Sequence, residues 1–489
     1  MMAPTSSPTD VGILSFGAYV PRKRLQRSAI YAANAWFAPG LKGLAKGERS
    51  VGDWDEDSIT MAVEAARDTL TGIDRASVGS LSLASTTLPY VDRLNSGIVK
   101  EALTLSDGVA ALDMTGSQRA GVSALRAALE AASGRTAPHL CLAAEMRKTC
   151  PASDLELTSG DAAAGLLIGQ GDVIAKFLGA YSLTLDFVDH YRTPGMDYDY
   201  FYEARWIREE GYVALTARAL KEGIAALGIE PSSIDRLLVP ISAKGIAATL
   251  AKKAGIAEAA VADTLQAGLG EAGSAHGLVM LVAALESAKP GEKILLLGFG
   301  QGADLILLET TDAITRLAPR DGVAGSLARG AKDENYMRWL VHRGLVDIDK
   351  GMRAEQDQKQ PSTSLWRHRK AVMGLVGGRC TKTGTVQFPK SDISVNPNDR
   401  TAGTQEDYPL AELPARVMTV TADSLSYSPS PPLYYGMVDF DGGGRMTVEF
   451  ADVAEEIEVG SEMRMVFRIK AVDEMRGMVK YFWKAAPVR

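Results

Sequence analysis

Cysteine is scarce in this sequence: its 489 residues include three, Cys141, Cys150 and Cys380. They form no CxxC pair, and any disulfide scheme would leave one of them over, so a disulfide framework is not expected and a reducing, cytoplasmic location is. Long apolar runs are missing too, because none approaches the roughly 18 residues that a membrane span requires. The sequence therefore predicts a cytoplasmic protein that does not enter the membrane.

Basic charge is also in deficit. The 53 Lys and Arg residues face 60 Asp and Glu residues, which gives a formal net charge of -7. Proteins that bind nucleic acid usually carry a basic patch or stripe, so nucleic acid is not an expected partner. The length and the 46% hydrophobic content fit a globular protein of two or three domains. Residues 1–9, rich in Ser, Thr and Pro, predict a disordered tail.

From residue 10 to about residue 325, apolar runs alternate with helical patterns. Strands are predicted at 11–20, 78–85, 109–113, 140–144, 162–168 and 174–178, with helices at 55–70, 94–102 and 122–132. A second round follows, with strands at 235–240, 293–297 and 304–309 and helices at 206–227, 245–254 and 275–288. This alternation is typical of an α/β fold with a mostly parallel sheet covered by helices. The similar order of the two rounds indicates an internal duplication.

The stretch 112–121 joins a buried strand directly to an Ala- and Leu-rich helix. Gln118 is expected at the N-terminus of that helix, where unpaired N–H groups and the helix dipole favour negative charge. Many enzymes place a nucleophile at such a strand-to-helix elbow. An amide is not a nucleophile, so Gln118 is either a hydrogen-bond donor to a carbonyl or carboxylate oxygen or a residue that only fills space.

The glycine-rich turn 269–274 carries a carboxylate, Glu271. In a buried turn a carboxyl group has a raised pKa and can act as an acid or a base. The alternative is a surface carboxylate, or one that pairs with Arg119 or Lys244. His276, at the start of the next apolar helix, is either catalytic or an ordinary core histidine.

The last third of the sequence differs in composition. Residues 333–360 are polar and lie in a predicted linker over 326–363, and residues 380–400 form a loop-rich stretch with turn signals. Residues 417–483 alternate apolar and polar side chains between Gly and Pro, which predicts a small antiparallel barrel in a domain over 401–489.

The order of motifs over residues 10–325 resembles the thiolase superfamily and, within it, the hydroxymethylglutaryl-CoA synthase branch. The segments that carry the resemblance are 83–90, 112–121, 159–165, 184–187, 269–274 and 298–303. The resemblance implies a five-layer αβαβα duplicated core, a homodimer and acyl-CoA as ligand, with CoA entering as part of the substrate and no separate cofactor. The tail from residue 364 resembles the DUF35 family, in which a small zinc ribbon precedes an OB-fold.

The departures from these families concern the chemistry. Gln118 stands where the thiolase-like enzymes have a nucleophilic cysteine, Thr86 where the synthase branch has a glutamate, Pro240 where it has a histidine, and Glu271 where it has an asparagine. An acyl-cysteine cycle needs a thiolate and a group that activates it, so synthase activity is not carried over to this chain. The four metal-ligand positions of the ribbon fall on Cys380, Thr383, Ser394 and Asp399. One thiol cannot replace a Cys₄ site, and no structural zinc is expected.

Further candidates lie in segments that line the pocket in these families. Tyr90 is a candidate acid or base and Tyr191 a candidate for substrate binding; the alternative for each is an ordinary packing or lid residue. His190 belongs to the same lid-like stretch. Thr86 is a further candidate for substrate binding, and Lys244 is a candidate for binding the CoA phosphates or else part of a solvated face. The basic residues 22–24 are candidates for the CoA phosphates, or simply a solvated face.

Three functions fit the sequence. The first is carbon–carbon bond cleavage or formation without an acyl-cysteine, by aldol or retro-aldol chemistry on a β-hydroxyacyl-CoA. Glu271 would be the base, assisted by Tyr90 or His276. Gln118 and the backbone of the elbow would hold the thioester oxygen. The second is a synthase-type acyltransferase with relocated groups, such as Cys150. The third is a non-catalytic acyl-CoA-binding scaffold for a partner enzyme.

Overall fold

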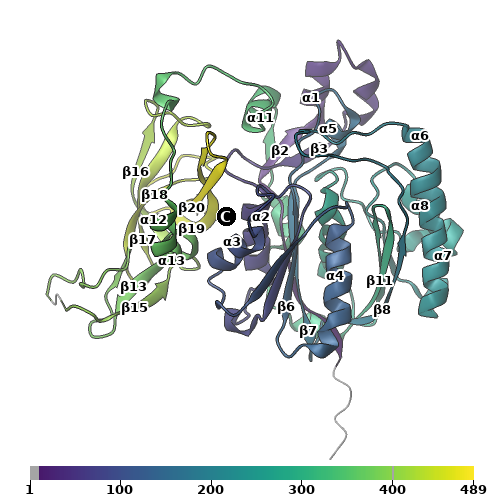
Figure 1. Cartoon of the computed structure of the whole chain (residues 1–489), viewed down its shortest axis with the longest axis horizontal. Helices are drawn as coiled ribbons and strands as arrows, with labels where there is room; N and C mark the ends of the chain where they lie inside the picture. Colours follow the sequence, from purple (N-terminus) through teal and green to yellow (C-terminus); the bar gives the residue numbers. More distant parts are fainter. Residues whose placement is uncertain (1–9, 399–400, 489) are drawn as a thin grey trace, which may run out of the picture. The chain divides into compact units, whose positions relative to one another are not determined.

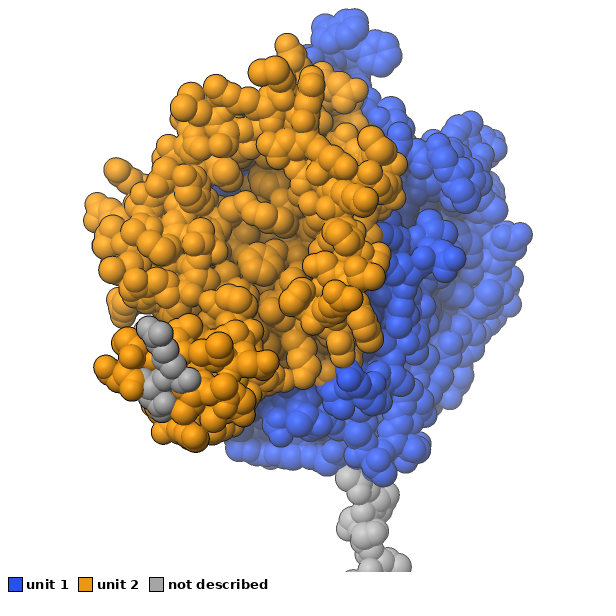
Figure 2. Space-filling model, turned by 60° about the vertical axis from the view of Figure 1, so that its left-hand side comes forward, with its two compact units in different colours: residues 1–52, 64–97, 106–336 blue, residues 53–63, 98–105, 337–489 orange. Residues whose placement is uncertain are grey.

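A computed structural model describes residues 10–398 and 401–488 of the chain. The predicted tail 1–9 and the ribbon position Asp399 lie outside the described residues. The chain forms two compact units, which Figure 2 distinguishes by colour. Unit 1 contains residues 10–52, 64–97 and 106–336, and unit 2 contains residues 53–63, 98–105 and 337–488.

Unit 1 is built on a nine-stranded sheet in the order β5-β4-β6-β7-β1-β8-β11-β10-β9 (Figure 1). Its strands are β1 (Val11–Tyr19), β4 (Ser80–Ala84), β5 (Ala110–Met114), β6 (His139–Glu145), β7 (Ala162–Gln170), β8 (Ala175–Thr184), β9 (Arg236–Leu238), β10 (Lys293–Phe299) and β11 (Gly302–Thr310). Each predicted strand of residues 10–325 is present. The apolar runs were sufficient to find them because most of these strands are largely buried, although β5 and β8 are partly exposed. The expectation of a mostly parallel sheet is wrong, since five of the eight strand pairings are antiparallel.

The two halves of this sheet repeat one pattern. In the first half β1 pairs antiparallel with β7, β7 antiparallel with β6, and β6 parallel with β4. In the second half β8, β11, β10 and β9 are joined in the same order and the same directions. Strand β5 extends the first half, whereas the second half has a single parallel bridge, Leu237 to Val261, in the equivalent place. The predicted duplication is confirmed.

Helices cover and separate these half-sheets. The helices that fall wholly or partly in unit 1 are α1 (Arg27–Asn34), α2 (Ser58–Thr69), α3 (Asn95–Ala102), α4 (Ala120–Ala131), α5 (Asp154–Thr158), α6 (Ala204–Trp206), α7 (Thr216–Leu227), α8 (Ile246–Ala254), α9 (His276–Glu286), α10 (Gly322–Ala328) and α11 (Tyr336–His342). The helix predicted over 206–227 is interrupted: residues Ile207–Leu215 form a π-helix, η4, between α6 and α7. A nine-residue π-helix is rare, and such segments are frequent at functional sites.

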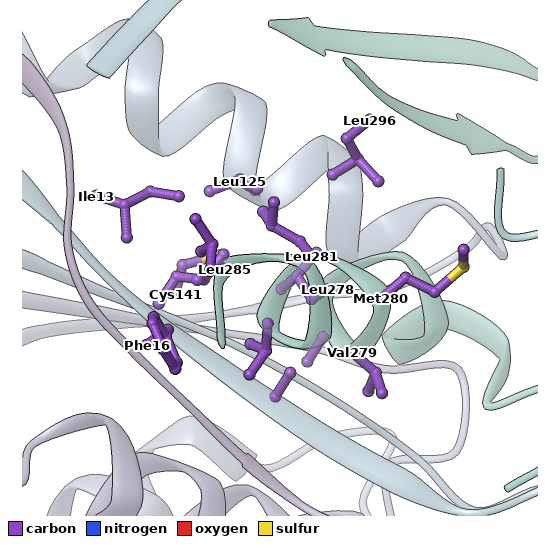
Figure 3. Packing of buried hydrophobic residues seen from close by; sticks show 14 of the residues in the cluster. Ile13, Phe16, Leu125, Cys141, Leu278, Val279, Met280, Leu281, Leu285 and Leu296 are labelled. Atoms are coloured by element: carbon purple, nitrogen blue, oxygen red, sulfur yellow. The ribbon is translucent and has the colours of Figure 1, made fainter. Parts of the chain in front are cut away.

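The core has the predicted five layers. Helices α4 and α9 lie in the middle, packed against Cys141 of the first half-sheet and Leu296 of the second (Figure 3). The alternate residues of the second half-sheet, such as Leu295 and Leu297, face α7 and α8. On the other side, a Cβ added at Gly165 would lie 2.4 Å from the Thr69 hydroxyl, so β7 packs closely on the end of α2. Helix, half-sheet, helix, half-sheet and helix therefore follow one another.

A three-stranded sheet that sequence patterns did not reveal joins β2 (Lys23–Gln26), β3 (Glu48–Val51) and β12 (Ala331–Asp333). Strand β2 contains most of the basic cluster proposed for CoA phosphates. Arg24 is buried, and its guanidinium donates to the Ser326 carbonyl at 3.0 Å. This arginine therefore stabilises the backbone instead of facing a ligand. The segment 326–363, predicted as a linker, carries β12 and α11.

Unit 2 contains a five-stranded barrel in the order β18-β17-β16-β19-β20. Its strands are β16 (Ala415–Asp423), β17 (Leu433–Phe440), β18 (Arg445–Glu449), β19 (Glu462–Asp473) and β20 (Met478–Pro487). A bridge between Phe450 and Ala485 brings β18 back to β20 and closes the barrel. The predicted OB-fold is thus present, preceded by helices α12 (Ser362–Arg367) and α13 (Arg369–Gly374).

An acidic segment from the N-terminal third of the chain belongs to unit 2. The guanidinium of Arg468, fully buried on β19, lies 3.3 Å from the Glu56 carboxylate, and the Lys484 ammonium lies 2.9 Å from that of Asp55. Tyr481 donates to Asp57 at 2.6 Å. The sequence placed Asp55 and Glu56 in the first turn of a helix. That placement is wrong, because α2 begins at Ser58 and these carboxylates pair with the cations of the barrel.

The ribbon-like segment forms a small sheet of β13 (Val376–Cys380), β14 (Val386–Gln387) and β15 (Gln405–Pro409). Cys380 is buried, and its Sγ lies 3.2 Å from the Thr404 hydroxyl and 3.6 Å from that of Thr401. Hydrogen bonds from Thr383, Thr404 and Thr401 lower the pKa of the Cys380 thiol to about 6. One thiol among hydroxyl groups does not fit a tetrahedral zinc site, which needs cysteine or histidine ligands.

Two further findings bear on the predicted protein class. None of the helices in the described part of the chain is both long and apolar enough to cross a membrane. Within residues 10–398 and 401–488, no group of three or more His, Cys, Asp or Glu side chains is arranged to hold a metal ion.

Candidate active site

The structure brings the elbow and the glycine-rich turn together. Residues 115–119 connect β5 to α4, and Gln118 lies two residues before the first helical residue, as predicted. Its side-chain amide donates a hydrogen bond to the Glu271 carboxylate. The packing is close here: a Cβ added at Gly121 would lie 2.3 Å from the Ser274 carbonyl oxygen. The small residues of the elbow therefore allow the two segments to touch.

A second neutral donor holds the other oxygen of Glu271. The Ser242 hydroxyl, in the loop after β9, donates to that oxygen at 2.6 Å. Gln118, Ser242 and Glu271 are called the Glu271 clamp below. Sequence reasoning missed Ser242, although it lies two residues beyond Pro240, the position that the family resemblance had already marked. A small polar residue at the end of a second-round strand was the available signal.

The backbone of Glu271 is fixed as firmly as its side chain. Its N–H donates to the Thr158 carbonyl at 2.8 Å, and its carbonyl accepts from Gly160 at 2.9 Å. Gly270 has a φ of +93°, and a Cβ there would lie 2.5 Å from the Ser159 carbonyl oxygen. Only glycine fits this turn without strain. The motifs 159–165 and 269–274, far apart in sequence, are thus neighbours.

Glu271 is half-buried, not enclosed as the sequence reasoning expected. The proposed pairings with Arg119 and Lys244 are not formed. The Arg119 guanidinium donates to the Leu183 carbonyl at 3.1 Å and lies 3.8 Å from the Asp304 carboxylate. Lys244 is exposed. The carboxylate of Glu271 therefore combines neutral hydrogen bonds with access to solvent, and keeps lone pairs for a ligand.

A second carboxylate, Glu145, lies at the end of β6 and is fully buried. Thr86 donates to it through its hydroxyl at 2.9 Å and its backbone N–H at 3.2 Å. Ser274 does the same through its hydroxyl and through its N–H, the latter at 3.2 Å. Thr86, proposed to bind substrate, is therefore occupied by Glu145. That buried carboxylate ties the segments around residues 86 and 274 to the sheet.

Arg147 is the buried cation of the site. Its guanidinium lies 3.5 Å from the Asp199 carboxylate, which also accepts from Arg192 at 3.0 Å. Burial opposes the charge of Arg147, but the carboxylates of Glu145, Asp199, Glu271 and Asp189, in decreasing order of effect, raise its pKa above the ordinary value. The guanidinium is thus a fixed positive charge among four acids.

Tyr212, presented by the π-helix η4, faces the same region. Burial raises the pKa of its phenol, and the negative charges of Glu271 and Asp189 raise it further. Its ring packs edge-on against Phe299 at 5.2 Å. Asp189 is buried and accepts from His190 Nδ1 at 2.9 Å. Sequence reasoning missed Tyr212, because the residue carries no local motif and the π-helix that orients it leaves no clear pattern.

His276 is the first residue of α9 and is fully buried. Its Nδ1 accepts a hydrogen bond from the backbone N–H of Ala272 at 3.3 Å. Burial lowers the pKa of this imidazole, against the opposing effect of Glu271. A neutral histidine in this position holds the turn that carries Glu271.

The other sequence candidates make their observed contacts outside the clamp. The Tyr90 ring packs under the Arg93 guanidinium at 4.6 Å, and its carbonyl accepts from Asn95. Tyr191 is 45% exposed and packs on Tyr200, with 5.4 Å between ring centroids. Cys150 is exposed as well.

Comparison with known proteins agrees with this architecture. The chain is 31% identical to a hydroxymethylglutaryl-CoA synthase of Methanosarcina mazei over 349 residues, which cover 69% of this chain and 99% of that enzyme. A hydroxymethylglutaryl-CoA synthase of Pyrococcus horikoshii is 31% identical over 322 residues, covering 64% of this chain and 90% of that enzyme.

Solved structures with a similar fold, and family models that match two segments of the chain, were also found. MvaS in complex with 3-hydroxy-3-methylglutaryl coenzyme A aligns with a TM-score of 0.58 at 20% identity, over 68% of this chain and 92% of MvaS. PksG of Bacillus subtilis, a hydroxymethylglutaryl-CoA synthase, aligns with a TM-score of 0.59 at 14% identity, over 72% and 95%. Residues 224–306 match the C-terminal model of 3-oxoacyl-[acyl-carrier-protein] synthase III, and residues 412–468 match the C-terminal OB-fold domain of ChsH2. The chain therefore belongs to the hydroxymethylglutaryl-CoA synthase family of thiolase-like proteins and carries, in addition, a C-terminal OB-fold domain of the ChsH2 type.

Proposed function

We propose that this protein is an acyl-CoA-processing enzyme that makes or breaks a carbon–carbon bond, by aldol or retro-aldol chemistry on a β-hydroxyacyl-CoA. The observation that carries the proposal is the Glu271 clamp. At the elbow where an acyl-transfer enzyme needs a nucleophile, this chain has an amide that orients a solvent-accessible carboxylate. An oriented carboxylate is suited to proton transfer. The relatives named as hydroxymethylglutaryl-CoA synthases support CoA thioesters as the substrate class.

In the cleavage direction, Glu271 accepts the proton of the β-hydroxyl group. The Cα–Cβ bond then breaks, its electron pair forms the enolate of the shortened acyl-CoA, and the carbonyl product leaves. The proton held by Glu271 returns to Cα of the enolate and restores the carboxylate. No covalent enzyme intermediate and no net redox change are involved, so the missing thiol is no obstacle.

The elbow supplies the stabilisation of the enolate. Gln118 lies just before α4, where backbone N–H groups and the helix dipole favour a developing negative charge. Its amide has two N–H donors, and one of them holds Glu271. In this scheme the second donor is directed to the thioester oxygen. His276 holds the turn, and Tyr90 has no assigned step because it lies in the loop beside Arg93.

The test is turnover of β-hydroxyacyl-CoA thioesters by the full chain and by Glu271→Gln. A glutamine fits the same space but cannot accept the proton, so we expect the rate to fall by about 10²-fold or more. Asp172→Asn, which alters an exposed carboxylate paired with Arg316, is the matched control and should keep full activity. Equal rates for the wild type and Glu271→Gln would exclude Glu271 as the base.

We also propose that unit 1 forms a homodimer. Strand β5 ends the nine-stranded sheet and leaves one row of backbone groups without a strand partner among the described residues. Leu112 in this strand is 43% exposed. An apolar edge strand is a template for pairing with another copy. Sedimentation of the wild type and of Leu112→Lys tests this: the wild type should be a dimer and the variant a monomer.

A further inference from the structure

The charged groups around the clamp are unbalanced. Arg147 is in electrostatic contact with the carboxylates of Glu145, Asp199, Glu271 and Asp189. A second guanidinium, that of Arg192, bonds to Asp199 at 3.0 Å. Four carboxylates against two guanidinium groups leave a formal charge of -2. The region is therefore acidic.

The positive charges are not directed to the open carboxylate. The side chains of Arg147 and Asp199 are 8% and 7% exposed, so this pair is closed off from solvent. Among the described residues, the hydrogen-bond partners of the Glu271 carboxylate are the neutral side chains of Gln118 and Ser242. Arg147 therefore acts on the most accessible carboxylate of the cluster only at longer range, while the groups that contact this carboxylate are neutral.

We infer that the site selects CoA thioesters with an uncharged acyl group and discriminates against acyl groups that end in a carboxylate. The inference rests on the proposed function, because it assumes that the acyl group binds beside Glu271. A carboxylate brought to about 5 Å from Glu271 would bind between roughly 4-fold and a few hundred-fold more weakly, depending on the local dielectric. The MvaS structure contains hydroxymethylglutaryl-CoA, whose acyl group does end in a carboxylate. In acyl specificity this chain would differ from that protein.

The experiment compares two probes of nearly equal size, one with a negatively charged acyl terminus and one with a neutral acyl terminus. Hydroxymethylglutaryl-CoA and its terminal carboxamide are titrated into the full chain by calorimetry at low and high salt. The amide should bind at least about 10-fold more tightly at low salt. Added salt should bring the ratio of the two affinities closer to one, because screening weakens the charge repulsion.

The Glu271→Gln variant removes the negative charge at nearly constant shape. We expect it to bring the two affinities within about 3-fold, chiefly by improving the binding of hydroxymethylglutaryl-CoA. Asp172→Asn also removes one charge, on the turn between β7 and β8, and should leave the ratio unchanged. Free CoA should bind all three proteins equally.

The outcomes separate this inference from the proposed function. Equal affinities of the wild type for the two probes, or tighter binding of the carboxylate through Arg147, would overturn the inference whether or not the enzyme cleaves a thioester. Tighter binding of the amide than of the carboxylate by the wild type, removed by Glu271→Gln and by salt, would support the inference even if no cleavage were seen. If Glu271→Gln fails to fold, the salt dependence of the wild type decides alone: a ratio that does not change with salt overturns the inference.

Discussion

Glu145 and Glu271 contribute to one electrostatic cluster, yet the protein holds them in opposite ways. Glu145 is fully buried and accepts from four donors of Thr86 and Ser274. Glu271 is half-buried and accepts from the side chains of Gln118 and Ser242. A carboxylate whose partners all come from the protein is part of the scaffold, whereas one with open lone pairs can take part in chemistry.

The same distinction separates other polar groups of unit 1. His139, at the opposite end of β6 from Glu145, is 3% exposed and has both ring nitrogens 2.8 Å from hydroxyl oxygens, those of Ser80 and Ser82. Like Glu145, it is a polar group whose hydrogen-bond partners all come from the protein; such groups are called closed groups below. Changes at closed groups should appear in stability, and changes at the clamp should appear in binding and turnover. The following predictions test this division.

Glu145→Ala gives the largest expected effect. The substitution removes a buried carboxylate, leaves the donors of Thr86 and Ser274 without an acceptor, and takes a counter-charge from buried Arg147. Breaking a buried ionic network in this way costs about 3–5 kcal/mol of unfolding free energy. Urea unfolding measures it. Glu271→Ala is the paired control and should cost less than about 1 kcal/mol, since its carboxylate is partly solvated. Equal losses of unfolding free energy in the two variants would contradict the division between a structural Glu145 and a reactive Glu271.

His139 makes stability depend on pH. Burial, with the neighbouring Arg135 charge, lowers the pKa of its imidazole to about 4 from an ordinary 6.5. Between these values the unfolded chain binds a proton that the folded chain does not, so the stabilisation is complete above about pH 6.5 and is lost as the pH falls towards 4. One such group accounts for roughly 3 kcal/mol at most.

Urea unfolding at a series of pH values from 4 to 7 measures this loss, and a His139→Gln variant identifies its source. The glutamine variant should be less stable than the wild type at pH 7 but should show a shallower fall towards pH 4. A slope that is the same in both proteins would assign the acid sensitivity to another group.

Ser242→Ala should have a smaller effect, and on a different property. Removing its hydroxyl leaves the Glu271 carboxylate oriented by Gln118 alone. The loss of one hydrogen bond to a charged group lowers kcat by about 10-fold, with little change in KM. Thr249→Ala, seven residues beyond Ser242, removes a hydroxyl that bonds to the Gly245 carbonyl and should leave both constants unchanged. An effect of Ser242→Ala on stability instead of kcat would place Ser242 among the closed groups.

The sequence was sufficient for the strands of the nine-stranded sheet, the duplication and the meeting of two motifs. Apolar runs identified the buried strands, and the glycine turn at 269–274 and the elbow at 112–121 are local patterns whose family order placed them together. Gln118 and Glu271 were therefore already candidates, and the structure brings their side chains into hydrogen-bond contact. Ser242 and Tyr212 were not, because their roles depend on where a loop and a π-helix point, which local patterns do not encode.

Other misses have the same physical origin. A basic cluster at 22–24 reads as a solvated face, yet Arg24 is buried because a distant segment, at Ser326, supplies a backbone acceptor. Asp55 and Glu56 fit a helix start, yet the partners of both lie more than 400 residues further along the chain, on β19 and β20. A charge pattern predicts local structure well only when the group that pairs with the charged residue lies nearby in the sequence.

Cys380 extends the comparison to unit 2 and gives the smallest expected effect. The buried thiol is surrounded by the hydroxyl groups of Thr401 and Thr404, so it belongs with the closed groups and needs no metal to satisfy it. We therefore expect the purified chain to contain no stoichiometric zinc and its Tm to change by less than about 1 °C on treatment with a strong chelator. Elemental analysis and thermal unfolding measure these quantities. About one zinc ion per chain, lost together with several degrees of Tm, would show that other residues complete a metal site and that Cys380 is an open group after all, since a structural zinc site contributes directly to folding.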